Sequence, residues 1–161
     1  MGGNSTLHAD IRQNLTTHEF SSIFISVGVM ALKIKLKPHE KMIIDGAVVT
    51  NGANRCELYI ENSVAILRQK DILGEKEADS PARRIYFAIQ LMYIDEKNLE
   101  VHHKTYWRLV QEFIQAAPSA LPVIDGISDY ILKGQYYQAL KGAQNLIEYE
   151  KEVIGRVQQF A

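Results

Sequence analysis

The chain has 161 residues and an ordinary globular composition, 47% hydrophobic and 23% charged, which suits one packed domain or two small ones. Its net charge of −1 excludes a protein that is strongly basic throughout, so any nucleic-acid-binding surface has to be local. The single cysteine, Cys56, excludes an internal disulfide and favours a reducing compartment.

The first 29 residues differ from the rest of the chain. They are polar, with Gly, Ser, Thr and Asn scattered through them and no helical period. Their most apolar run, residues 20–29, is too short to cross a bilayer and follows no basic leader, so we expect neither a membrane anchor nor a signal peptide. We interpret residues 1–29 as an N-terminal extension, either flexible or the product of an upstream start, in front of a domain over residues 30–161.

Residues 30–74 show the patterns of short β-strands. In the first stretch, MALKIKLKP over residues 30–38, aliphatic side chains alternate with lysines, which is the period of a half-buried strand, and the proline ends it. Further apolar runs follow, and the dipeptides between them are Asp45-Gly46, Asn51-Gly52 and Glu61-Asn62. Because Asp-Gly and Asn-Gly favour hairpin turns, we predict a small antiparallel β unit of about four or five short strands.

Residues 75–161 have helical spacing instead. Asp79 or Ser80 can cap a helix that begins at Pro81 and runs to about residue 94. Apolar side chains at helical spacing predict three more helices, over about residues 97–116, 122–133 and 135–159. No long linker separates strands from helices, so the predicted fold class is one compact α+β unit. It has a small N-terminal antiparallel β unit over residues 30–74 and a C-terminal bundle of about four helices over residues 75–161.

Five stretches follow one another along the chain: MALKIKLKP (30–38), IDGAVVTNG (44–52), LYIENSVAILRQKDIL (58–73), SPARRIYFAIQLMY (80–93) and GQYYQALKGAQNLIEYE (134–150). In this order they resemble the FlbT family of flagellar regulators. Residues 1–29 lie outside the resemblance. It implies an RNA-binding post-transcriptional regulator that binds the 5′ leader of flagellin mRNA and controls its translation and decay, usually as a repressor.

The basic residues are unevenly distributed. Residues 30–70 carry seven basic and four acidic side chains, a net charge of +3, whereas the remainder carries 11 basic and 15 acidic ones, a net charge of −4. We therefore expect the phosphate-binding surface on the β unit, extended by two arginines of the first helix. The candidate RNA-binding residues are Lys33, Lys35, Lys37, Lys41, Arg55, Arg68, Lys70, Arg83 and Arg84. The alternative for the strand lysines is protection of an edge strand against aggregation.

Arg83 and Arg84 stand where helix stability alone would not place them. Cations at a helix N-terminus are unfavourable by roughly 0.3–1 kcal/mol each, so a negative group is expected nearby. One hypothesis is an RNA phosphate held by the helix N-terminus and the guanidinium groups. The other is an ion pair within the chain, with Asp71, Glu75 or Asp79 as the candidate carboxylates.

Aromatic side chains could stack on unpaired RNA bases. Most of them fall on apolar helical stripes and are expected in the core; the candidates are Tyr59, Tyr86, Tyr93, Tyr106, Trp107, Tyr136 and Tyr137. Tyr59 is the best candidate for stacking because it lies in a strand whose neighbouring residues, Leu58 and Ile60, should face the opposite side.

No motif of a common enzyme class is present. The sequence has no HExxH metal site, no P-loop, no GxGxxG and no GxSxG, so we expect no enzyme, no cofactor and no metal. The expected partner is the flagellin mRNA leader, and the expected location is the cytoplasm, away from membranes. The helical half leaves a second hypothesis open, in which the chain is a protein-binding adaptor or chaperone-like partner. Its partner would then be flagellin, another flagellar regulator such as FlaF, or a second copy of the chain.

Overall fold

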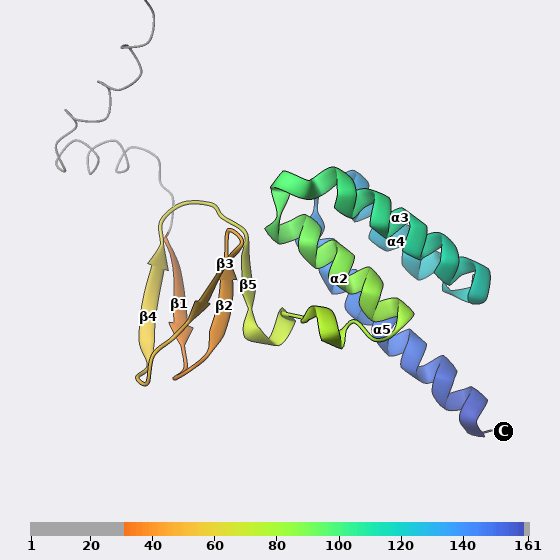
Figure 1. The fold of residues 1–161 in the computed structure, drawn as a ribbon, viewed down its shortest axis with the longest axis horizontal. Coiled ribbons are helices and arrows are strands. Elements are labelled where there is room, and N and C mark those ends of the chain that lie inside the picture. Colours follow the sequence, from red (N-terminus) through yellow and green to blue (C-terminus); the bar gives the residue numbers. More distant parts are fainter. Residues whose placement is uncertain (1–30, 160–161) are drawn as a thin grey trace, which may run out of the picture. The chain divides into compact units, whose positions relative to one another are not determined.

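The computed structural model describes residues 31–159, which form strands first and helices afterwards (Figure 1). This confirms the α+β fold class and the four predicted helices. The strands are β1 (Leu32–Leu36), β2 (Lys41–Ile44), β3 (Ala47–Thr50), β4 (Cys56–Ile60) and β5 (Ile66–Arg68). The helices are α2 (Pro81–Ile94), α3 (Leu99–Ala116), α4 (Leu121–Leu132) and α5 (Tyr136–Gln159). The proposed N-terminal extension, residues 1–29, lies outside the described residues.

The described residues divide into two compact units, and the smaller one consists of β1 and β4. These strands pair antiparallel, with Lys35 opposite Glu57 and Lys33 opposite Tyr59. The predicted alternation along β1 is confirmed, because Ile34 is buried whereas both lysines are exposed.

The second unit contains a three-stranded antiparallel sheet in the order β3-β2-β5. Asp45 and Gly46 join β2 to β3 with positive φ angles of 48° and 78°, as a two-residue hairpin turn requires, so this predicted turn is confirmed. The hairpin predicted at Asn51-Gly52 is wrong, because β3 does not pair with the strand that follows it. The side-chain amide of Asn51 instead donates to the carbonyl oxygens of Lys37 and Asn54, at 2.7 and 2.8 Å, and closes a loop.

The four helices of the second unit enclose the main hydrophobic core. Helix α2 begins as predicted, with Pro81 in its first turn and the Ser80 hydroxyl accepting a hydrogen bond from the backbone N–H of Arg83. Helix α2 packs on α3 and α5, and α4 packs on α5. Fully buried side chains from all four helices meet there, among them Ile85, Ile89, Met92, Tyr106, Ile124, Ile127, Leu140 and Leu146. Among the described residues, no helix is both long enough and apolar enough to cross a membrane.

Helix α2 fixes the segment that connects β5 to it. The Tyr86 hydroxyl donates to the carbonyl oxygen of Asp71 at 2.7 Å, and burial together with the Asp71 charge raises the pKa of Tyr86 to about 12. The Gln90 side chain both accepts from the N–H of Leu73, at 2.8 Å, and donates to its carbonyl oxygen, at 2.9 Å. The Tyr93 hydroxyl accepts from the N–H of Ile66 at 3.1 Å. These bonds satisfy backbone groups of the connection and hold it in one place.

Candidate nucleic-acid interface

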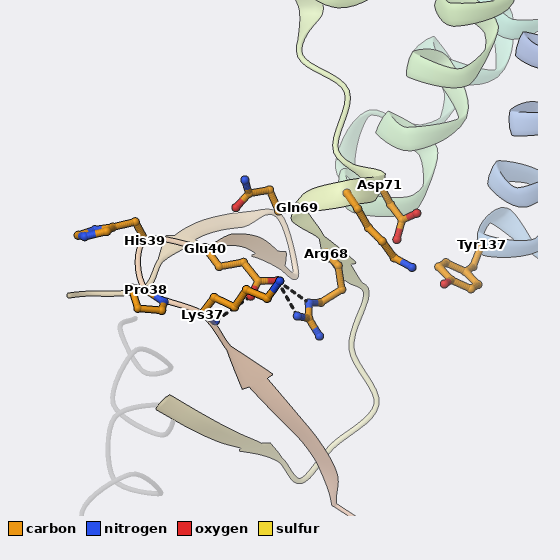
Figure 2. Close-up of a pocket in the computed structure, with 9 residues that line it drawn as sticks. Lys37, Pro38, His39, Glu40, Arg68, Gln69, Asp71 and Tyr137 are labelled. Carbon is orange, nitrogen blue, oxygen red and sulfur yellow. Dashed lines mark hydrogen bonds and ion pairs between the residues drawn. The ribbon is translucent and has the colours of Figure 1, made fainter. Parts of the chain in front are cut away.

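One concave feature of the second unit is a cavity of about 870 Å³, within the usual size range of binding sites (Figure 2). It brings together three of the predicted RNA-binding residues, Lys37, Arg68 and Lys70. We call it the basic cleft and define it by its lining residues: Lys37, Pro38, His39, Glu40, Arg68, Gln69, Lys70, Asp71 and Tyr137. The β strands and the turns around them supply all of these residues except Tyr137, which comes from α5.

Local hydrogen bonds shape one wall of the basic cleft. Before β2 the chain makes a tight turn in which the N–H of Lys37 donates to the Glu40 carboxylate at 2.8 Å, and His39 has a φ of 60°. Arg68 of β5 donates to the same carboxylate through Nε at 3.2 Å. The Lys37 N–H and the Arg68 guanidinium hold the pKa of Glu40 below its usual value. The turn and the edge of β5 are therefore tied together at the cleft.

The charges of the cleft do not cancel. Glu40 is compensated by Arg68, and the buried carboxylate of Asp71 is compensated by Lys141 of α5 at 3.1 Å. Among the residues that the structure describes, neither Lys37 nor Lys70 has a carboxylate within ion-pair distance. The Lys37 charge contributes to the lowered pKa of Glu40, but neither ammonium group is held in an ion pair by a described carboxylate, so both can contact an anion at this site.

The other two strand lysines, Lys33 and Lys35, lie in the smaller unit and share one carboxylate. Lys33 lies 2.7 Å from Glu57 and Lys35 lies 3.6 Å from it. Hydrogen bonding to Glu57, and secondarily to Tyr59, raises the pKa of Lys33. The Lys33 ammonium also lies 5.5 Å from the ring centroid of Tyr59, which is 57% exposed as the sequence predicts.

The remaining predicted residues do not line the basic cleft. Lys41 is exposed at the start of β2, and its N–H donates to the Gln69 side chain at 2.7 Å. Arg55 is exposed in the loop before β4. Arg83 pairs with Asp79 at 3.1 Å, one of the three carboxylates suggested by the sequence. Arg84 is exposed, and none of the described carboxylates pairs with it.

Sequence reasoning did not single out one functional feature and missed another. Tyr137, one of the aromatic candidates for stacking, is 38% exposed and lines the cleft, whereas the sequence favoured Tyr59. Adjacent tyrosines on a helix point about 100° apart, and this is the signal that one of Tyr136 and Tyr137 had to lie outside the core. The other feature is the negative group at the α2 N-terminus, which is Glu150 of α5, whose carboxylate accepts from the N–H of Ala82 at 3.0 Å.

The described residues offer no metal site, because no three His, Cys, Asp or Glu side chains among them are grouped to hold an ion. The adjacent histidines of α3 point to different partners: His102 contacts Asp95 at 3.0 Å, and His103 contacts the Tyr136 hydroxyl at 3.1 Å. The fold and the cleft thus define a small α+β protein with a cleft lined by Lys37, Arg68 and Lys70.

The chain belongs to the FlbT family: the family model described as "Flagellar protein FlbT" matches residues 32–154. It is 44% identical to the probable flagellum biosynthesis repressor protein FlbT 1 of Bradyrhizobium diazoefficiens, over 79% of this chain and 87% of that protein. It is 38% identical to the flagellum biosynthesis repressor protein FlbT of Caulobacter vibrioides, over 80% of this chain and 92% of that protein. No solved structure matches the chain. The names of these relatives describe regulators rather than enzymes.

Proposed function

We propose that this chain is an RNA-binding post-transcriptional regulator of flagellin synthesis, which binds the 5′ leader of flagellin mRNA and represses its translation and promotes its decay. Membership of the FlbT family supports a regulatory role in flagellar synthesis, because the curated relatives are named repressors of flagellum biosynthesis. The RNA-binding step is supported by one observation above the others: Lys37, Arg68 and Lys70 converge on the basic cleft. Such a protein acts in the cytoplasm, where the mRNA is translated.

Electrostatics supplies the affinity in this proposal. Each lysine that neutralises a phosphate releases a condensed counterion, so the affinity falls as the salt concentration rises. For single-stranded RNA, the logarithm of the affinity falls with the logarithm of the salt concentration with a slope of about 0.7 per phosphate contact, which we call the salt slope. The exposed Lys41 and Arg55, and the β1 lysines, add further cations on the β strands and their loops. The chain itself cleaves nothing; decay follows from a recruited nuclease or from a blocked ribosome.

The test is fluorescence anisotropy of a labelled flagellin leader, titrated with the full chain at several salt concentrations beside a scrambled RNA. Tight, leader-selective binding with a steep salt slope supports the proposal. The double variant Lys37→Glu, Lys70→Glu should weaken binding and lower the salt slope by about 1.4, because two phosphate contacts are lost. The matched control is Lys97→Glu, which reverses an exposed lysine in the turn before α3. Equal binding of leader and scrambled RNA by the unmodified chain overturns the proposal.

A second candidate function is the protein-binding adaptor. It is favoured by an apolar groove of about 290 Å³ between the start of α2, the end of α3 and α5, with Phe113 and Val153 among its lining residues and Arg84 beside them. The substitution Ile154→Asp, on the α5 wall of this groove, should abolish binding of purified flagellin or FlaF while leaving RNA binding intact. If leader selectivity is absent and Ile154→Asp abolishes such a protein complex, the adaptor function replaces the RNA-binding one.

A further inference from the structure

We infer that the basic cleft binds an unpaired RNA segment, with a base packed against Tyr137 and neighbouring phosphates held by Lys37 and Lys70. This inference rests on the proposed RNA binding and adds which form of RNA is bound and by which residues. Figure 2 shows His39 and Tyr137 on opposite sides of the cleft, with Arg68 and Asp71 between them. A strand of RNA that follows the cleft would therefore pass from the basic turn to the aromatic ring.

The charges of the cleft suit two neighbouring phosphates. Both carboxylates that line it are already engaged, Glu40 by Arg68 and Asp71 by Lys141, so neither is free to repel an anion. Lys37 lies on the turn before β2 and Lys70 in the short helical turn after β5, and both are exposed. These two turns are tied to each other through Glu40 and Arg68, so the spacing of the two ammonium-bearing segments is fixed before any ligand arrives.

Tyr137, the aromatic residue of the cleft, is held by contacts with neighbouring side chains. Tyr137 packs against Tyr93 with ring centroids 5.7 Å apart, and the Lys141 ammonium lies 5.2 Å from its ring centroid. Lys141 is in turn anchored by the buried carboxylate of Asp71 at 3.1 Å. The exposed part of Tyr137 lines the cleft, and these contacts reduce the entropy that the side chain would lose when a base packs on it.

The combination of a cleft and an aromatic side chain distinguishes unpaired RNA from a duplex. Lysines on an open surface would be sufficient to bind the phosphates of a duplex. An aromatic ring inside a cleft can be reached only by a base that has left its stack, and proteins that recognise RNA sequence use loops and unpaired segments in this way. The volume of about 870 Å³ exceeds what a single phosphate requires and leaves room for a base beside it.

The inference is tested with the full chain and four probes measured by anisotropy or competition. The probes are the flagellin leader, an unpaired oligonucleotide of about eight nucleotides of leader sequence, a fully paired hairpin stem, and free nucleoside monophosphate as competitor. Tyr137→Ala should weaken binding of the leader and of the oligonucleotide on the order of tenfold, because one stacked base is lost. Tyr137→Phe should restore it, and neither change should alter the weak binding of the stem.

Two further variants show whether a loss of RNA binding is specific to the cleft or results from a general loss of structure. Tyr130→Ala removes a tyrosine of similar exposure, 40% against 38%, from α4 outside the cleft, and should leave RNA binding unchanged. Lys70→Ala removes an exposed ammonium group and should weaken binding of the same two probes and reduce the salt slope by about 0.7. Circular dichroism of each variant reports whether the fold is kept.

The outcomes distinguish this inference from the proposed function. If the unmodified chain selects the leader but Tyr137→Ala and Lys70→Ala bind it as tightly as Tyr130→Ala does, the cleft is not the site and the RNA-binding function stands. Preference for the paired stem, or tight binding of the free monophosphate without binding of the oligonucleotide, also overturns the inference. If the unmodified chain does not select the leader, the proposed function fails, and this inference fails with it.

Discussion

The carboxylate of Glu150, near the C-terminal end of the chain, accepts a hydrogen bond from the Ser80 hydroxyl, 70 residues earlier. It also accepts from the N–H of Ala82, so a side chain of α5 closes the N-terminus of α2. This negative group lies where the helix dipole is positive. It explains how α2 accommodates two arginines in its first turn, since Glu150 supplies the favourable charge and Asp79 pairs with Arg83.

Substitution of Glu150 should destabilise the protein. The Glu150 side chain is buried, and Glu150→Ala leaves the N–H of Ala82 and the Ser80 hydroxyl without their acceptor, so we expect a loss of about 2–3 kcal/mol in the free energy of unfolding. Glu150→Gln keeps one oxygen acceptor but removes the charge, and should lose about 1 kcal/mol. Urea unfolding followed by circular dichroism measures both values.

The matched control is Glu148→Ala on the same helix. Glu148 is exposed and, among the described residues, pairs only with Lys151, three residues away, so its removal should change the stability by less than about 0.5 kcal/mol. Equal losses at Glu148 and Glu150 would show that the contact between α5 and the start of α2 contributes nothing.

The ion pair between Asp71 and Lys141 should respond asymmetrically to mutation. Asp71 is only 7% exposed, so Lys141→Met leaves a buried carboxylate whose remaining side-chain contact is the Gln144 amide at 3.5 Å. We expect a loss of about 2–4 kcal/mol for Lys141→Met, because a buried charge without its counter-charge is costly. Asp71→Asn should lose about 1 kcal/mol, since the 42% exposed side chain of Lys141 can turn to water.

Lys104→Met provides the surface reference for that comparison. Lys104 pairs with Glu100 one turn earlier on α3, and both side chains are largely exposed. Its substitution should change the stability by at most about 0.5 kcal/mol. Thermal or urea unfolding of the three variants gives the order directly, and a greater loss for Asp71→Asn than for Lys141→Met would contradict the proposed asymmetry.

Gly46 should tolerate no side chain. Its φ of 78° belongs to the left-handed region, and an added Cβ would lie 2.9 Å from the carbonyl oxygen of Ile94 at the end of α2. Gly46→Ala should therefore destabilise the protein by about 1–3 kcal/mol. Gly52→Ala is the control, because a Cβ there meets no atom within 4 Å and Gly52 is not among the glycines with positive φ. Similar unfolding midpoints for the two variants would contradict the prediction.

Local features of the sequence predicted the elements that depend on local interactions. The start of α2 follows from Ser80 and Pro81, and the turn between β2 and β3 follows from Asp45-Gly46, because capping and turn conformation are decided within a few residues. The same holds for the alternation of Lys33 and Lys35 with buried aliphatic residues in β1.

Contacts between distant segments could not be predicted in this way. Strand β1 pairs with β4, whereas β2 lies between β3 and β5 and pairs with both, so the strands do not form a single series of hairpins. Which lysines share the cleft depends on that pairing: Lys33 and Lys35 face Glu57, whereas Lys37 joins Arg68. The individual cations of the candidate site were predictable from composition, but their grouping was not.

The stability of the protein should fall on acidification partly through Glu40. Its pKa lies below the ordinary value of 4.5, because the folded chain places the Lys37 N–H and the Arg68 guanidinium against the ionised carboxylate. The unfolded chain then binds a proton more readily, so this stabilisation is present above the unfolded value and is lost as the pH falls through the lower folded pKa. The melting temperatures of the unmodified chain and of Glu40→Gln, recorded from pH 7 to pH 3, should converge towards acid. A difference that stays constant over this range would mean that Glu40 does not stabilise the turn through its charge.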